Sequence, residues 1–189
     1  MDQSISEYLD YLLLINRRVN LVSRRITREQ LNTLVSETKR MSKEISGRRV
    51  IDAGSGNGIL GIVLALINPE KDIILLESIE KKTNFLKSAV LHLKLPNVEV
   101  FKNRLEDFRF SYNPEKTTLV SRGFPSLQAL AEPLLSGEVN EVVAITSLKK
   151  IENLIIPLEK VERTIYNIPF RDVIKILKME NVSRETIKR

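Results

Sequence analysis

The sequence predicts an α/β fold: a seven-stranded, mostly parallel sheet with helices on both faces and a helical cap before the first strand. Two observations predict this fold. From Val50 onward, short apolar runs typical of buried strands alternate with helical segments. The first run ends in an acid and leads into four glycines within eight residues, a pattern typical of a tight strand–helix turn. We therefore expect one domain, with residues 1–46 as the cap and residues 47–180 as a Rossmann-like core.

The composition is typical of a globular protein with an ordinary core: 189 residues, 42% hydrophobic and 29% charged. The absence of cysteine excludes disulfides and thiolate metal sites, and we expect no metal. No apolar run approaches the roughly 18 residues of a membrane span, and the first residues lack the pattern of a secretory signal. We expect a cytoplasmic protein that does not contact membranes. The net charge of +6 permits an acidic partner such as RNA.

Two helices are predicted before the first strand. Apolar residues at helical spacing predict the first over residues 5–22. A capping box of Thr27 and Gln30 predicts the second, which should run to about Glu44 and end at Gly47.

A basic run spans the end of the first predicted helix and the segment before the second. Its arginines fit either a phosphate-binding patch or the solvated end of a helix, and the charge run alone favours the second interpretation. They are Arg17, Arg18, Arg24 and Arg25.

The glycine-rich turn fits two cofactor classes. Gly56-x-Gly58-x-x-Gly61 matches the dinucleotide fingerprint, with an acid about twenty residues further on. Asp52-x-Gly54-x-Gly56-x-Gly58 is also the pattern of S-adenosylmethionine enzymes, in which the acid lies under the cationic amino-acid portion of the cofactor. A nicotinamide site has no need of a carboxylate near its pyrophosphate. Asp52 therefore favours the methyl donor.

The next strands carry further candidate contacts at their carboxyl ends. The second strand, 73–76, ends in Glu77, which can accept hydrogen bonds from both ribose hydroxyls of an adenosine-containing cofactor. A helix from Glu80 to Leu93 leads to a third strand at 98–101. In methyl-donor folds the loop after this strand borders the adenine; here it contains Leu105 and Glu106.

The loop after the fourth strand, predicted at 119–120, faces the reactive methyl in such folds. It contains Arg122 and Phe124, which could hold an RNA base or phosphate, or could make an ion pair and a core contact.

The rest of the chain completes the alternation. The predicted elements are a helix at 127–135, a strand at 141–146, a short helix from Lys149 to Ile156, and strands at 161–168 and 170–177, with the last strand antiparallel. A polar tail begins at Glu180.

Several motifs in their shared order resemble the GidB/RsmG family of bacterial small-subunit ribosomal RNA guanine-N7 methyltransferases. The resemblance runs from about Tyr8 to Phe124. The matching segments are the leucine-rich helix ending in Asn20-Leu21, the glycine loop Asp52 to Gly61, Leu75-Leu76-Glu77-Ser78, Leu93-Lys94-Leu95-Pro96-Asn97, Asn103-Arg104-Leu105-Glu106 and Ser121-Arg122-Gly123-Phe124.

The resemblance implies an S-adenosylmethionine-dependent enzyme that methylates guanine N7 in small-subunit ribosomal RNA, free or in a ribosomal particle, and that we expect to be a monomer. Arg122 would orient the donor or the target, and the four arginines would grip phosphates. The family's donor contacts fall on Gly54, Ile59, Leu105, Glu106 and Arg122, with Glu77 at the position of its ribose-binding acid and Asp52, Gly56 and Gly58 in the glycine loop.

Three positions depart from the family's pattern. Leu60 replaces a proline, residues 34–38 lack a histidine, and no Lys-Gly follows the fifth strand, where the nearest lysines are Lys149 and Lys150. Three alternatives therefore stay open: a methyltransferase with a small-molecule or protein acceptor, an NAD-dependent oxidoreductase, and a non-catalytic relative.

Overall fold

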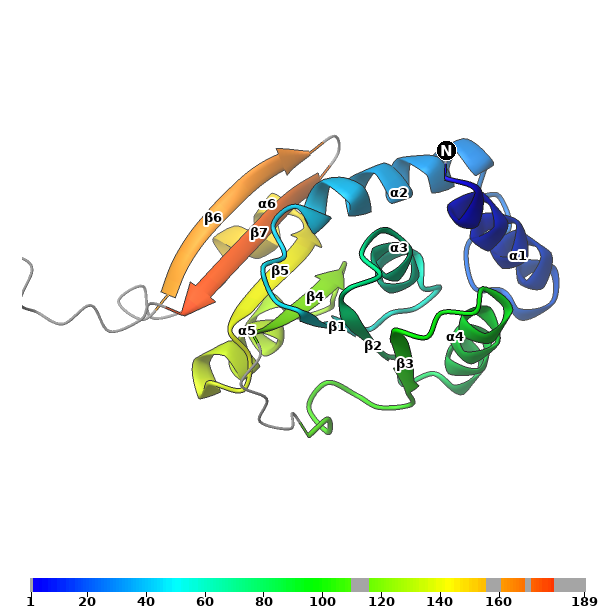
Figure 1. Ribbon diagram of the computed structural model, residues 1–189. Helices are drawn as coiled ribbons and strands as arrows, with labels where there is room; N and C mark the ends of the chain where they lie inside the picture. Colours follow the sequence, from blue (N-terminus) through cyan, green and yellow to red (C-terminus); the bar gives the residue numbers. More distant parts are fainter. Residues whose placement is uncertain (1, 110–115, 156–160, 169–170, 179–189) are drawn as a thin grey trace, which may run out of the picture.

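The computed structural model describes residues 2–109, 116–155, 161–168 and 171–178 (Figure 1). The predicted positions Ile156, Phe170 and Glu180, with the tail, lie outside the described residues. The helices are α1 (Gln3–Val19), α2 (Arg28–Ser42), α3 (Ile59–Ile67), α4 (Glu80–His92), α5 (Leu127–Ser136) and α6 (Leu148–Glu152). The strands are β1 (Arg49–Ala53), β2 (Asp72–Leu76), β3 (Val98–Phe101), β4 (Thr117–Arg122), β5 (Glu141–Thr146), β6 (Val161–Ile168) and β7 (Arg171–Lys178).

The strands form one seven-stranded sheet in the order β3-β2-β1-β4-β5-β7-β6. All pairs from β3 to β5 are parallel, and β7 is antiparallel to both β5 and β6. This confirms the predicted mostly parallel sheet and its antiparallel last strand. The strand order reverses between β1 and β4, and open α/β sheets bind ligands beyond the carboxyl ends of the strands at such a switch point.

Alternate strand residues enter two separate cores, as expected for a sheet covered on both faces. Val50 lies in a core with buried residues of α1, α2, α3 and α4, whereas Ile51 lies in a second core with residues of α5 and α6. In Figure 1, α2 runs above α3, from the side of α1 toward β5 and β7. The two N-terminal helices therefore cover the same face of the sheet as α3.

Helix α1 ends earlier than its apolar pattern predicts. Asn20 adopts a left-handed conformation, with φ of 54°, directly after the helix. The side-chain oxygen of Asn16 accepts hydrogen bonds from the backbone N–H groups of Leu21 (2.6 Å) and Val22 (2.9 Å). Asn16 thus turns the chain out of the helix, while Leu21 is still buried in the core.

The predicted capping box of α2 is confirmed, but its predicted end is wrong. Thr27 and Gln30 make both reciprocal hydrogen bonds. The helix ends at Ser42, before Gly47. Gly47 is required for a different reason: a Cβ there would lie 2.5 Å from the Thr118 hydroxyl oxygen.

Strand β4 is longer than predicted, because its polar residues are buried and paired. Thr117, Thr118 and Ser121 all lie in the interior. The Ser121 hydroxyl donates to the Ala53 carbonyl at 2.8 Å, across the β1–β4 switch point. Hydropathy alone does not reveal a strand of this kind.

No helix in the described ranges has the length and apolar content needed to cross a bilayer. Among the same residues, no three His, Cys, Asp or Glu side chains are grouped as metal ligands would be.

Candidate active site

The glycine loop between β1 and α3 exposes its backbone at the carboxyl edge of the sheet. Gly54, Gly56 and Gly58 have φ of 70°, 61° and 81°, values that other residues rarely adopt. The N–H groups of Gly54 and Ser55 both donate to the Leu76 carbonyl at 2.9 Å, which fixes the start of the loop on β2. Gly54 remains exposed, so a ligand can approach its backbone closely.

The last glycine of the pattern brings α3 against the sheet. A Cβ at Gly61 would lie 2.1 Å from Leu75 Cδ2 and 2.8 Å from Asp52 Oδ2. Its N–H instead donates to Asp52 Oδ2 at 3.0 Å. Close packing of α3 on β1 therefore depends on the missing side chain.

The Asp52 carboxylate is buried beneath the glycine loop. Burial raises its pKa to about 7, although hydrogen bonds from Ser55 and Gly61 and the charge of Arg122 oppose the rise, and the charge of Glu77 adds to it. A carboxylate in this state gains stability from any cation placed beside it. Asp52 is thus suited to interact with a positively charged group of a ligand.

Glu77, directly after β2, supports the glycine loop from below. It is buried, and its two carboxylate oxygens accept hydrogen bonds from the N–H groups of Gly56 and Ile79, both at 2.8 Å. Its predicted contact with ribose stays a prediction. The contact that the structure shows is with the glycine loop, through the Gly56 N–H.

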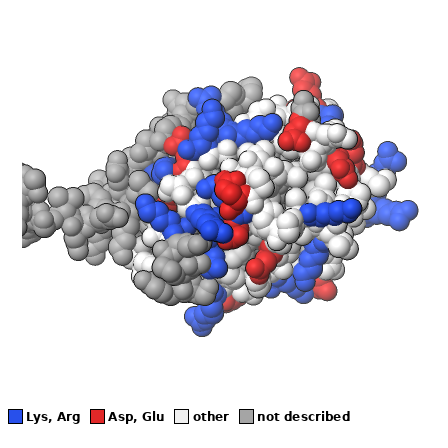
Figure 2. Space-filling view, in the orientation of Figure 1, with Lys and Arg blue, Asp and Glu red and all other residues white. Residues whose placement is uncertain are grey.

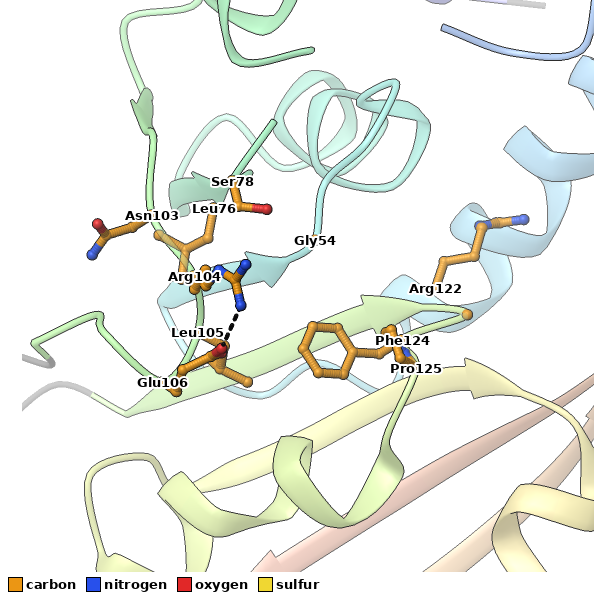
Figure 3. Close-up of a pocket in the computed structure, with 11 residues that line it drawn as sticks. Gly54, Leu76, Ser78, Asn103, Arg104, Leu105, Glu106, Arg122, Phe124 and Pro125 are labelled. Atoms are coloured by element: carbon orange, nitrogen blue, oxygen red, sulfur yellow. Dashed lines mark ion pairs between the residues drawn. The ribbon is translucent and has the colours of Figure 1, made fainter. Parts of the chain in front are cut away.

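A cavity of about 260 Å³ lies beyond the ends of the strands (Figure 3). Arg104 and Glu106 form an ion pair of 3.5 Å at its rim. Of the predicted donor contacts, the cavity brings together Gly54, Leu105, Glu106 and Arg122. Gly56 and Gly58 belong to the glycine loop itself, and Asp52, Ile59 and Glu77 lie next to it. The other lining residues are Leu76, Ser78, Asn103, Arg104, Gly123, Phe124 and Pro125.

The Arg122 guanidinium points toward α2 and away from the Phe124 ring (Figure 3). Its Nη1 lies 2.6 Å from Glu37 Oε2, and its Nη2 donates to the Leu34 carbonyl at 2.9 Å and to Thr38 Oγ1 at 3.1 Å. The contacts that the structure shows therefore fasten β4 to α2. A direct role in orienting donor or target stays a prediction.

Sequence reasoning missed Glu37 as a site residue. It was noted only as part of the segment that lacks a histidine. Glu37 shares a helix face with Leu34 and Met41, and an acid among apolar positions at helical spacing was the available signal.

Two other supporting residues were also missed. The Lys150 ammonium donates to the Phe124 carbonyl at 2.7 Å and so holds the loop after β4. The Tyr8 hydroxyl donates to the Asn57 carbonyl at 2.5 Å. Neither partner could be inferred from local sequence.

The four predicted RNA-binding arginines lie at the end of α1 and in the loop before α2. Arg17 and Arg18 belong to the last turn of α1, and Arg24 and Arg25 precede the Thr27 cap. All four are exposed, and none forms an ion pair with another described residue. Figure 2 shows basic and acidic side chains interspersed over one face of the molecule, so that face presents no single positive field.

Two solved structures with a similar fold are named as methyltransferases. Precorrin-6y C5,15-methyltransferase from Geobacter metallireducens has a TM-score of 0.59 at 14% identity, over 84% of this chain and 92% of the other. The tRNA (m1A58) methyltransferase TrmI from Aquifex aeolicus has a TM-score of 0.58 at 14% identity, over 76% and 68%. Likeness at this identity shows the fold alone.

Sequence comparison identifies the family. Residues 1–167 match the family model GidB, rRNA small subunit methyltransferase G. Ribosomal RNA small subunit methyltransferase G of Glaesserella parasuis is 30% identical over 89% of this chain and 85% of its own length. The protein of that name from Hydrogenovibrio crunogenus is 40% identical over 67% of this chain and 59% of its own length. The chain therefore belongs to the GidB family.

Proposed function

We propose that this protein uses S-adenosylmethionine to methylate N7 of a guanine in small-subunit ribosomal RNA. The observation that carries the proposal is the glycine loop of a GidB-family chain, open at Gly54 above a buried carboxylate, at the switch point of the sheet. The relatives in this family are named for the methylation of small-subunit ribosomal RNA.

The residues of the loop fit the donor. An added Cβ at Gly54 would meet the Phe124 ring at 3.4 Å, so a glycine keeps the cavity open at this point. Asp52 would hold the cationic amino-acid portion, and Glu77 the ribose hydroxyls. Leu105 and Glu106 would border the adenine. When bound, S-adenosylmethionine supplies an electrophilic sulfonium methyl.

The protein's contribution to the reaction is alignment and exclusion of water. Guanine N7 is a nucleophilic lone pair that carries no proton, so no general base is required, and orientation is the main source of acceleration. The loop after β4 is held from both sides, by Arg122 on α2 and by Lys150 on Phe124. We propose that Arg122 acts by fixing this loop beside the methyl group.

The acceptor is proposed to bind through the four exposed arginines. Contacts between arginines and phosphates release counterions, so RNA affinity should fall steeply with salt. Changing Arg17, Arg18, Arg24 and Arg25 to glutamine should weaken RNA binding and flatten this dependence. Unchanged affinity and slope would show that RNA binds elsewhere.

The first experiment is calorimetric titration with S-adenosylhomocysteine, with NADH as the competing candidate. We expect micromolar binding of the former and loss of binding in Gly54→Leu. Gly137→Leu is the matched control: Gly137 also has a positive φ, of 85°, but it ends α5 away from the cavity. Binding of NADH alone would support the oxidoreductase, and binding of neither ligand would support a non-catalytic relative.

The second experiment identifies the acceptor. Purified small subunits and free small-subunit RNA are incubated with radiolabelled S-adenosylmethionine, and 7-methylguanine is detected by borohydride and aniline cleavage. Incorporation of the label into either RNA substrate, together with a new cleavage site in that RNA, supports the proposal. Donor binding without RNA labelling would point to a different acceptor.

A further inference from the structure

Helix α1 makes a hydrogen bond to the glycine loop that no sequence pattern indicated. The Tyr8 hydroxyl donates to the Asn57 carbonyl at 2.5 Å, between residues that are 49 positions apart. Helix α1 and the glycine loop are separate elements, and this hydrogen bond joins the N-terminal helices to the candidate donor site.

The Tyr8 side chain is held inside the core of the protein. It is completely buried in the core between Ile5, Leu9 and Leu12, which share its face of α1. Burial, with the nearby charge of Asp52, raises the pKa of Tyr8 well above its usual value, so the hydroxyl remains a donor at any physiological pH. The helix thus presents a fixed donor to the loop.

The receiving carbonyl belongs to Asn57, in the middle of the glycine loop. Asn57 stands between Gly56 and Gly58, which both adopt positive φ and bring high backbone freedom. The Asn57 side-chain oxygen is already used, because it accepts from the N–H of Ile59 at 3.0 Å. The neighbouring Gly56 N–H is fixed separately by Glu77. The Tyr8 hydroxyl therefore adds a hydrogen bond from α1 to the backbone carbonyl between these two glycines.

We propose that Tyr8 is a positioning residue for the donor: its hydroxyl holds the glycine loop in the conformation that binds S-adenosylmethionine. This inference rests on the proposed function. In the wild type the hydrogen bond orders the loop before the ligand binds. Without the hydroxyl, the loop must be ordered during binding, which weakens affinity but leaves the bound geometry unchanged. The effect should therefore appear in donor affinity and not in the rate of the bound complex.

The test compares Tyr8→Phe with Tyr11→Phe. The Tyr8 variant keeps the buried ring and removes only the hydroxyl. Tyr11 lies on the same helix but stacks on His92 and Phe85, so its variant controls for loss of a hydroxyl from α1. One neutral hydrogen bond corresponds to about a 3- to 10-fold change in equilibrium constant. We expect that increase in the dissociation constant of S-adenosylhomocysteine and in KM for the donor for Tyr8→Phe, with kcat unchanged and with no increase for Tyr11→Phe.

Amide hydrogen exchange gives a second, independent measurement. Residues 54–59 should exchange faster in ligand-free Tyr8→Phe than in the wild type or Tyr11→Phe, and equally slowly once ligand is bound. A dissociation constant within twofold of wild type would overturn the proposal, as would a Tyr8→Phe protein without a cooperative unfolding transition, because the hydroxyl would then serve the fold alone. Failure of the wild type itself to bind the ligand would instead refute the proposed function.

Discussion

Two buried acids lie at opposite ends of the same sheet, and their pKa values are shifted in opposite directions. Asp52 is near the carboxyl end of β1, and burial raises its pKa to about 7. Glu141 begins β5 at the amino end, where burial would raise its pKa, but hydrogen bonds from Thr118 and Ser46 and the charge of Lys175 hold that pKa below its usual value.

The difference lies in the number of partners. Glu141 accepts from Ser46 N (2.6 Å), Ser46 Oγ (2.8 Å), the Gly47 N–H (3.3 Å) and the Thr118 hydroxyl, and Lys175 Nζ lies 3.4 Å away. The Asp52 carboxylate has fewer partners: the Gly61 N–H donates to Oδ2 at 3.0 Å, the Ser55 hydroxyl also hydrogen-bonds to it, and Arg122 acts through its charge. At the amino end of the sheet the partners of Glu141 outweigh the cost of its burial, whereas at the carboxyl end the partners of Asp52 do not.

Removal of the satisfied acid should have the largest effect on stability. In Glu141→Ala, the Ser46 N–H and the hydroxyls of Ser46 and Thr118 lose their acceptor inside the protein. The Lys175 ammonium loses its nearest carboxylate and keeps only the Glu44 carbonyl. We expect a loss of about 3–5 kcal/mol in the free energy of unfolding, measured by urea denaturation. Glu138→Ala, an exposed neighbour, should change it by less than about 0.5 kcal/mol. A loss below about 1 kcal/mol for Glu141→Ala would mean that the hydrogen bonds of Glu141 do not stabilise the amino end of the sheet as proposed.

The pH dependence of stability should separate the two acids. The pKa of Asp52 is raised by folding, so its contribution is complete below the ordinary Asp pKa and is lost as pH rises through about 7. The pKa of Glu141 is lowered, so its contribution is present above the ordinary Glu pKa and is lost as pH falls through the lowered value. The wild type should therefore lose unfolding free energy as pH rises from 5 to 8. In Asp52→Asn this loss should be smaller by about 3 kcal/mol.

Ligand binding should depend on pH in the opposite direction from stability, and the same Asp52 variant tests this. The wild type should bind S-adenosylhomocysteine more weakly as pH falls from 8 to 6, because protonation removes the charge that meets the ligand's ammonium group. Asp52→Asn should bind at least about tenfold more weakly at pH 8, with little dependence on pH. Asp107→Asn, on the exposed loop after β3, is the control. Equal binding by Asp52→Asn would exclude this acid from the donor site.

Glu37→Gln should have the smallest effect of the series. The variant keeps an acceptor for Arg122 but removes the opposing charge, and the Leu34 carbonyl and Thr38 hydroxyl still bind the guanidinium. We expect a loss of about 1–2 kcal/mol in the free energy of unfolding. Glu29→Gln, exposed in the first turn of the same helix, should change it by a few tenths. Equal losses in both variants would mean that the buried pair has no special role.

Local patterns predicted the elements whose partners are close in sequence. The glycine loop, the capping box of Thr27 and Gln30, and strands β3 and β5 were predicted because backbone conformation and apolar runs there are set by neighbouring residues. Element ends were less accurate where a polar side chain decided them, as Asn16 does for α1.

The supporting contacts of the site could not be predicted, because they join distant segments. Arg122 binds Glu37 across 85 positions, and Tyr8 binds Asn57 across 49. A tyrosine at a core position of an amphipathic helix is fully explained by its ring, so nothing in the sequence indicates where its hydroxyl points. The positions of site residues were thus more predictable than the contacts that hold them.

The strand order also has a consequence for the synthesis of the protein. Strand β7 is inserted between β5 and β6, although it follows both in the chain. At roughly 5–20 residues per second, the roughly 30 residues from the end of β5 to the end of β7 take a few seconds to translate. During that interval the growing chain has β5, an apolar strand, as an open edge that can pair with other chains. Nascent chains in which β5 has left the ribosome but β7 has not should therefore bind chaperones more strongly than the complete, released chain.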